Sequence, residues 1–200
     1  MTQSTWTLLD ESHQALRTVV AGVPASGWSL PTPCEQWTVA QVLQHAAGDQ
    51  IAYAAKLTGG PGPDADPFAP SGDIGGDPSA LLESALSAAA DAFAAVAPDD
   101  AEVPVPLPPF KLPAPSAVAA AAMDAAVHAW DIAVATGQPS PLTPALARAL
   151  RPTADTLVEP LRGFAFGPAV ESEAGADDAV SLLNFLGRRA DWTPLGVSGK

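Results

Sequence analysis

The chain has 200 residues, of which 48% are hydrophobic, enough for one domain with a buried core. Nine Lys and Arg residues stand against 22 Asp and Glu residues, and this formal net charge of -13 argues against nucleic acid and against a membrane surface as partners. Cys34 is the single cysteine, which excludes an intramolecular disulfide, and the first residues lack both the basic start and the apolar run of a signal peptide, so we expect a cytoplasmic protein.

Two helices are predicted in the first part of the chain. Apolar residues recur at helical spacing over 5–22, where a glycine and a proline follow. A second helix begins at Thr38, which forms a capping box with Gln41, and it continues to about Leu57. His45 lies in the middle of this second helix.

The middle of the chain alternates loops with one helix. Residues 59–77 contain six Gly and four Pro, a composition that predicts a long mobile loop. Asp77 caps a third helix over 78–97, whose first residue is proline. Residues 98–115 contain seven prolines and are predicted to form an extended crossover on the surface. The span 57–110 holds nine acids and no Lys or Arg, which we interpret as a solvated acidic flank, with binding of a cation or a basic partner as the alternative.

The remaining elements are also helical. An alanine-rich helix is predicted over 116–136, ending at Gly137, and further helices are predicted near 144–158 and 177–187. The alternating stretch 103–107 contains two prolines and cannot form a central strand.

The predicted fold is therefore all-α. Residues 1–140 form a four-helix up-down bundle, and residues 141–200 form a C-terminal helical extension packed on it, so that the chain is a single domain overall. Three polar residues exclude the alanine-rich helix as a membrane span: Asp124, His128 and Asp131.

Asp124 and His128 are the main candidates for chemistry. Residues four apart on a helix lie on one face, about 6 Å apart, and burying such polar groups costs several kcal/mol unless they are paired or bind a metal. If the second and fourth helices face each other, His45 joins them, and two imidazoles with one carboxylate match the ligands of a catalytic zinc site. The alternative for His45 is a residue at the bundle edge, hydrogen-bonded to Asp49.

Other polar and aromatic residues have simpler interpretations. Asp131 either orients a histidine or pairs with a neighbouring helix. His13 is interpreted as a surface or core-edge residue, and Cys34 as a structural cysteine rather than a nucleophile. Trp37 and Trp130 are interpreted as core residues, with a role in lining a pocket as the alternative. The sequence contains no glycine-rich phosphate loop and no GxSxG, HExxH or CxxC motif.

Two segments resemble a known family. TPCEQWTVAQVLQHAAG and MDAAVHAWDIAVATGQ, with LLNFLGRRADWTP near the end, are similar to actinobacterial proteins related to the metal-binding N-terminal domain of mycothiol-dependent maleylpyruvate isomerase, among the DinB-like bundles. The resemblance implies a four-helix bundle with a divalent metal held by His45, Asp124 and His128. Zinc is favoured, and nickel, iron and manganese are alternatives. It also implies mycothiol as co-substrate. The isomerase has a glutamate where this chain has Asp124.

The expected function is that of a metal-dependent enzyme, a transferase or isomerase that uses mycothiol on a small electrophilic substrate, with His45, Asp124 and His128 as both catalytic and metal-binding residues. A thiol-independent metalloenzyme of secondary metabolism is one alternative. A non-catalytic metal-binding or ligand-binding module is the other. The expected partners are a small-molecule substrate and a low-molecular-weight thiol, and the expected assembly is a monomer or homodimer.

Overall fold

The computed structural model describes residues 6–34 and 36–194 and consists mainly of helices. They are α1 (Thr7–Ala21), α2 (Val39–Thr58), α3 (Pro78–Ala94), α4 (Ala114–Ala135), α5 (Pro144–Leu157), α6 (Asp178–Phe185) and the short 3-10 helix η1 (Glu159–Leu161). The predicted all-α fold is confirmed. The first residue of the predicted first helix, Thr5, lies outside the described residues.

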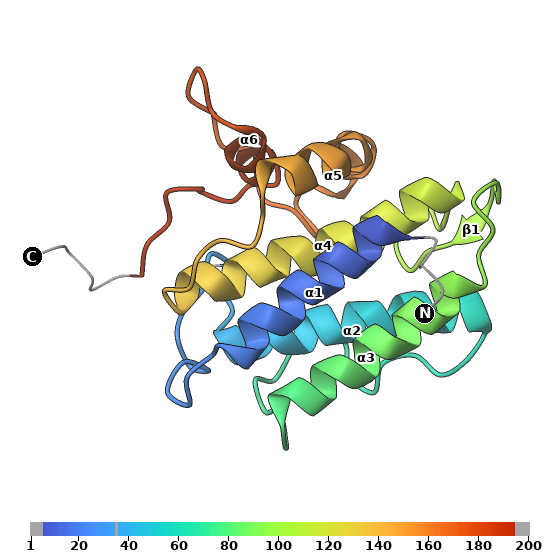
Figure 1. Ribbon diagram of the computed structural model, residues 1–200, viewed down its shortest axis with the longest axis horizontal. Coiled ribbons are helices and arrows are strands. Elements are labelled where there is room, and N and C mark those ends of the chain that lie inside the picture. The colour runs from blue at the N-terminus through green and yellow to red at the C-terminus, as the bar shows by residue number, and fades with distance from the viewer. Residues whose placement is uncertain (1–5, 35, 195–200) are drawn as a thin grey trace, which may run out of the picture.

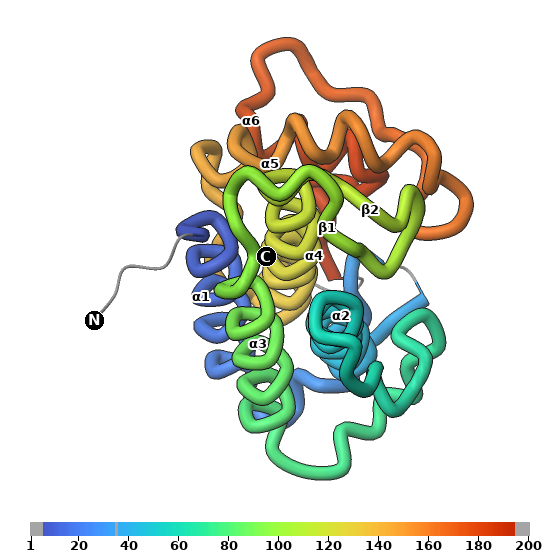
Figure 2. Tube along the Cα trace, turned by 90° about the vertical axis from the view of Figure 1, so that its right-hand side faces the viewer, coloured from blue at the N-terminus to red at the C-terminus, as the bar shows by residue number. Residues whose placement is uncertain are grey.

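The helices α1 to α4 form the bundle, and α5 and α6 lie over α4 on the side away from α3 (Figures 1 and 2). Helix α4 contacts α1, α2 and α5. Helices α2 and α3 run in the same direction, so the predicted up-down order of the bundle is wrong for this pair (Figure 1). The loop between them is long enough to return along the bundle before α3 begins. This return brings the loop alongside α2, the helix that carries His45.

Local signals in the sequence set most helix ends. Thr38 and Gln41 form the predicted capping box of α2, and the side chain of Asp77 accepts a hydrogen bond at the start of α3. Gly137 has a φ of 71°, as expected for the residue that ends α4. Helix α4 starts two residues earlier than predicted, at Ala114, because a proline fits the first turn, where no amide donor is needed.

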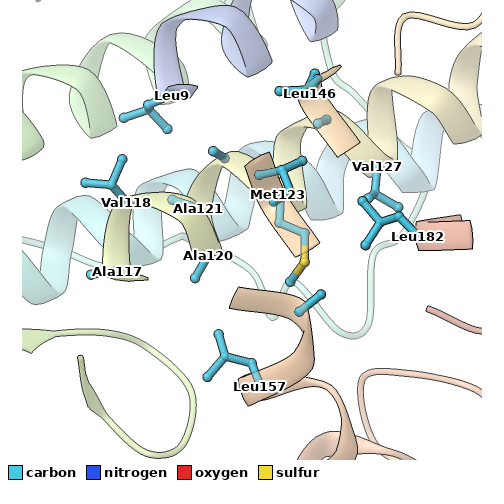
Figure 3. Packing of buried hydrophobic residues seen from close by; sticks show 14 of the residues in the cluster. Leu9, Ala117, Val118, Ala120, Ala121, Met123, Val127, Leu146, Leu157 and Leu182 are labelled. Atoms are coloured by element: carbon cyan, nitrogen blue, oxygen red, sulfur yellow. The ribbon is translucent and has the colours of Figure 1, made fainter. Parts of the chain in front are cut away.

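Helix α4 is the core of the molecule, because almost all of its residues are buried. Figure 3 shows Met123 and Val127 of α4 among leucines of the last two helices, Leu146, Leu157 and Leu182. Within the described part of the chain, α4 alone is long and apolar enough to cross a membrane. Of an apolar 18-residue stretch within it, however, 89% is buried inside the fold. It is therefore a core helix, packed against α1, α2 and α5.

Residues 98–115 differ from the prediction of a surface crossover. They form an antiparallel hairpin of β1 (Val103–Pro104) and β2 (Lys111–Leu112). Val103, Val105 and Leu112 are buried in the core, so one side of the hairpin packs inward. Both strands are edge strands, the position at which a proline can be accommodated.

Candidate metal centre

The structure brings the three predicted residues together. His45 comes from the middle of α2, and Asp124 and His128 lie one turn apart on α4. Oδ1 of Asp124 lies 3.4 Å from Nε2 of His128 and 3.7 Å from Nε2 of His45. One ligand atom from each residue lies within 4.8 Å of the others. These residues form a group that could bind a metal ion, because three ligand atoms converge on one point.

The second ring nitrogen of each histidine is engaged elsewhere. Nδ1 of His45 donates a hydrogen bond of 2.9 Å to the backbone oxygen of Pro67, and Nδ1 of His128 donates one of 2.9 Å to Oδ2 of Asp131. When each ring is neutral and has its proton on Nδ1, the lone pair of Nε2 faces the cluster. Histidines that bind metals usually have this arrangement, so the residues present fit a divalent ion.

One alternative for His45 was a hydrogen bond to Asp49, and this alternative is wrong. Nε2 of His45 lies 3.7 Å from Oδ2 of Asp49, too far for a hydrogen bond, and its Nδ1 bonds to Pro67 instead. Burial, followed by the neighbouring His128, lowers the pKa of His45 to about 4. The imidazole is therefore neutral at neutral pH, as a metal ligand must be.

Asp131 orients a histidine, as one of its two interpretations predicted, and its ion pair is with a residue outside the helices. It accepts the hydrogen bond from His128, and it forms an ion pair with Arg188, whose Nη2 lies 2.9 Å from Oδ2. Arg188 lies after α6 rather than on a neighbouring bundle helix. Burial raises the pKa of Asp131, but the guanidinium of Arg188 outweighs this effect and holds the pKa below its usual value. Cys34 also contacts this pair, since its thiol donates to Oδ2 of Asp131 at 3.4 Å.

A second chain of hydrogen bonds reaches Asp124 from the core. Nε2 of Gln50 donates to Oδ2 of Asp124 at 3.4 Å, and Oε1 of Gln50 accepts from Nε2 of His13 at 2.9 Å. His13 is only 1% exposed, so the interpretation as a surface or core-edge residue is wrong. It sits inside the bundle because Gln50 satisfies its ring N–H there.

The carboxylates determine the charge of His128. Burial lowers the pKa of His128, but Asp124 and the hydrogen bonds to Asp124 and Asp131 hold it well above its usual value. Burial raises the pKa of Asp124, whereas His128, His45 and Gln50 together hold it below its usual value. In the protein without metal, the cluster therefore holds an ionised carboxylate beside a protonated His128.

A cavity of about 710 Å³ opens from the cluster between the bundle and the C-terminal part of the chain. His45, Asp124 and His128 line it, and so does Trp37, which was interpreted mainly as a core residue. Trp130, by contrast, is buried in the core as predicted. The volume is within the range of sites for small molecules.

Sequence reasoning missed Arg188 and Gln50 as parts of this site. Gln50 has no distinguishing pattern, since it lies one residue after Asp49 on an otherwise ordinary helix. Arg188 had a usable signal, because a chain with only nine basic residues carries two adjacent ones at 188–189. Neither residue can be assigned to Asp124 or Asp131 without the fold, which joins segments 57 and 74 residues apart.

Comparisons with known proteins identify the family of the chain. The family model described as "Mycothiol maleylpyruvate isomerase N-terminal domain" matches residues 9–133, which include His45, Asp124 and His128. Two relatives from Mycobacterium tuberculosis, "Uncharacterized protein MT0763" of strain CDC 1551 and "Uncharacterized protein Rv0738" of strain H37Rv, are each 30% identical over 182 residues, covering 88% of this chain and 93% of the relative. No solved structure matches the chain.

Proposed function

Because the chain belongs to the mycothiol maleylpyruvate isomerase N-terminal domain family, we propose that it is a metal-dependent enzyme in which mycothiol attacks a small electrophilic substrate, in a transfer or an isomerisation. The observation that supports this most strongly is the convergence of Nε2 of His45, Nε2 of His128 and Oδ1 of Asp124 in the lining of one cavity. Three protein ligands beside an open cavity are typical of catalytic rather than structural metal sites.

His45, Asp124 and His128 would hold the ion. Two imidazoles and one carboxylate favour zinc, and nickel, iron and manganese are alternatives that bind similar ligands. A divalent ion bound there would stabilise the anion of a coordinated thiol, and so supply a thiolate at neutral pH.

The other residues of the site fix these three side chains. Asp131, itself held by Arg188, orients the ring of His128, and the backbone of Pro67 orients the ring of His45. Gln50 holds the second oxygen of Asp124, which leaves the first oxygen facing the imidazoles. Such supporting contacts typically change metal affinity or activity by about 10-fold to 100-fold when removed.

The proposed chemistry consumes no further reactant. In a transfer, the thiol sulfur bonds to an electrophilic carbon and the thiol proton ends on the adjacent carbon, so the whole thiol is in the product. In an isomerisation, the same carbon–sulfur bond forms and then breaks after rotation about the neighbouring bond, and the thiol is regenerated. Substrate and thiol would both reach the ion through the cavity that the three candidate ligands line.

The remaining parts of the proposal concern partners and location. A small-molecule substrate and a low-molecular-weight thiol are the proposed partners, without nucleic acid or membrane, which agrees with the net charge of -13. A cytoplasmic location agrees with a single free cysteine. The protein would act as a monomer or a homodimer.

The test compares metal-loaded and metal-free protein with and without mycothiol. We expect about one divalent ion per chain, and consumption of a reactive enone faster than with mycothiol alone, only in the metal-loaded protein. Absence of bound metal after reconstitution with zinc, nickel, iron or manganese would overturn the site. A bound ion without any thiol-dependent rate, across diverse electrophiles, would favour a thiol-independent enzyme or a binding module instead.

A further inference from the structure

We propose that the substrate of this site is a neutral, planar, apolar electrophile, seated against a wall formed by Phe68 and Phe164. This inference rests on the proposed function, because it names the substrate class of the same site. Three observations on the cavity support it: aromatic rings line the cavity, the arginines that line it are paired with carboxylates, and part of its wall comes from the C-terminal segment of the chain.

Aromatic rings extend outward from the metal cluster. The ring of Phe68 lies 5.4 Å from that of His45, and the ring of Phe164 lies 5.0 Å from that of Phe68, measured between centroids. The centroid of the Trp37 ring lies 4.7 Å from that of His45. All of these side chains line the cavity. Centroid separations of 4.5–7 Å are those at which aromatic rings attract each other, so a planar ring could join this series.

Phe164 is 64% exposed although it is large and apolar. It belongs to a turn after η1, and Phe68 belongs to the loop between α2 and α3, so the wall joins two loops that are far apart in sequence. An exposed apolar side chain at the edge of a cavity gains free energy when a ligand covers it. Contact with this wall would therefore stabilise a bound apolar ligand, because the exposed surface of Phe164 is not buried by the fold itself.

In the described part of the chain, the cavity offers no unpaired cation to an acidic substrate. Among the described residues, the basic side chains that line it are Arg188 and Arg189. Arg188 is paired with Asp131, and Arg189 with Asp191. Apart from a bond to the ion itself, a carboxylate on the substrate would have to displace the buried Asp131 from Arg188, or pair with Arg189, whose exposed charge is already solvated. A neutral substrate has no such cost.

The wall also lies partly outside the region shared with the family. The family model matches residues 9–133, whereas Phe164, Arg188 and Arg189 follow that region. The metal cluster is thus within the shared region, and half of the proposed substrate surface belongs to the C-terminal extension. A difference in substrate from the isomerase would then follow from a difference in this extension.

The test compares enones that share one reactive group. Benzylideneacetone carries an aromatic ring, methyl vinyl ketone lacks it, and the para-carboxylate of benzylideneacetone adds a negative charge. Because the ring also lowers the intrinsic reactivity of benzylideneacetone, each kcat/KM is divided by the rate constant with mycothiol alone. With metal present, we expect this enhancement in the wild-type protein to be larger for benzylideneacetone than for either of the others. Phe164→Ala should lower the ratio of kcat/KM between benzylideneacetone and methyl vinyl ketone about tenfold.

A matched control is Phe110, a second exposed large hydrophobic residue in the described part of the chain, which is 57% exposed and does not line the cavity. Phe110→Ala should keep the wild-type ratio, and Phe164→Tyr should retain most of it. Equal loss from Phe164→Ala and Phe110→Ala, or a larger enhancement for the carboxylate than for benzylideneacetone, would overturn the proposed substrate class even though thiol-dependent activity is present.

A binding measurement keeps the inference testable if no thiol chemistry is found. Benzylacetone, the saturated and unreactive analogue, should bind the metal-loaded protein in calorimetry without any thiol, and Phe164→Ala should weaken its binding about tenfold. If the wild-type protein shows no thiol-dependent activity but binds benzylacetone, and Phe164→Ala weakens that binding, the proposed function is contradicted and the apolar wall is supported. Absence of binding in the wild-type protein would overturn the wall itself.

Discussion

The backbone oxygen of Pro67 accepts a hydrogen bond of 2.9 Å from Nδ1 of His45, so the loop between α2 and α3 fixes the ring of a candidate ligand. The loop can approach α2 this closely because Gly48, three residues further along the helix, has no side chain. A Cβ at this position would lie 3.0 Å from Cγ of Pro67. A glycine inside a helix costs about 0.5–1 kcal/mol relative to alanine, and here it permits a close contact beside the site.

Gly48→Ala should therefore weaken metal binding while the helix stays formed. The added methyl group pushes Pro67 outward and loosens its hydrogen bond to His45, whereas alanine itself favours the helix. We expect a loss of metal affinity of about tenfold, measured by competition with a chelating dye, with an unchanged circular dichroism spectrum. The control is Gly62→Ala in the same loop, where a Cβ would meet no atom within 4 Å. Equal affinities of the two variants would show that the Pro67 contact does not matter.

The histidines should differ in their effect on the metal. His45→Ala and His128→Ala should each abolish tight binding, because two remaining ligands hold a divalent ion poorly. His13→Ala should keep about one ion per chain, although it should lower the free energy of unfolding, since it leaves Gln50 without its donor in the core. Elemental analysis of the three variants measures the number of ions bound per chain, and urea unfolding of His13→Ala measures its free energy of unfolding. Loss of the ion from His13→Ala but not from His45→Ala would place the centre on α1 instead of α2.

The sequence predicts more of the fold than of the site. The capping residues Thr38, Asp77 and Thr143 mark helix starts locally, and all three accept hydrogen bonds at those starts. The i and i+4 spacing likewise places Asp124 beside His128 without knowledge of the fold. The contacts of Arg188 and Pro67 depend on how distant segments pack, which no local pattern records. The hairpin of 103–112 was missed for a related reason, because prolines hide a pairing that a two-stranded sheet tolerates.

The buried ion pair of Asp131 and Arg188 should matter far more than an exposed pair. Arg188→Met leaves a buried carboxylate without its partner, which typically costs about 3–5 kcal/mol. Urea unfolding of the metal-free protein should show this loss, and Asp131→Asn combined with Arg188→Met should recover part of it. Arg148→Met, which breaks the exposed pair with Asp178, should cost no more than about 1 kcal/mol. Similar costs for Arg188→Met and Arg148→Met would contradict the structural importance of the buried pair.

Metal binding should release protons at neutral pH. The pKa of His128 is held well above its usual value by Asp124 and Asp131 against the effect of burial, so the ring is protonated without metal and must lose that proton to bind an ion. The pKa of His45 lies at about 4, so its ring is already neutral. Affinity should therefore rise with pH above 6.5, until the raised pKa of His128 is passed. Calorimetry in buffers of different ionisation enthalpy should give about one proton per ion at pH 7, and a value near zero would contradict the assigned charge of His128.

The variant Asp124→Asn tests whether the proposed thiol chemistry depends on the metal. Oδ2 of Asp124 accepts from Gln50, and Oδ1 faces both imidazoles. An asparagine has one oxygen, so it either turns its NH2 group toward the ion or places it against the NH2 group of Gln50, and it also lacks the negative charge. Metal affinity should fall, while the apolar contacts of α4 keep the helix formed and the circular dichroism spectrum unchanged.

The rate in excess of mycothiol alone should then fall in the same proportion as the bound metal, measured on one preparation of Asp124→Asn at several metal concentrations. Asp91→Asn, at an exposed position of α3, is the control and should keep both the metal and the rate. A rate that survives complete removal of metal would exclude thiolate formation at the ion. A rate that is lost while the metal remains bound would instead assign Asp124 a role in the reaction beyond holding the ion, because its charge would then act on the thiol or the substrate directly.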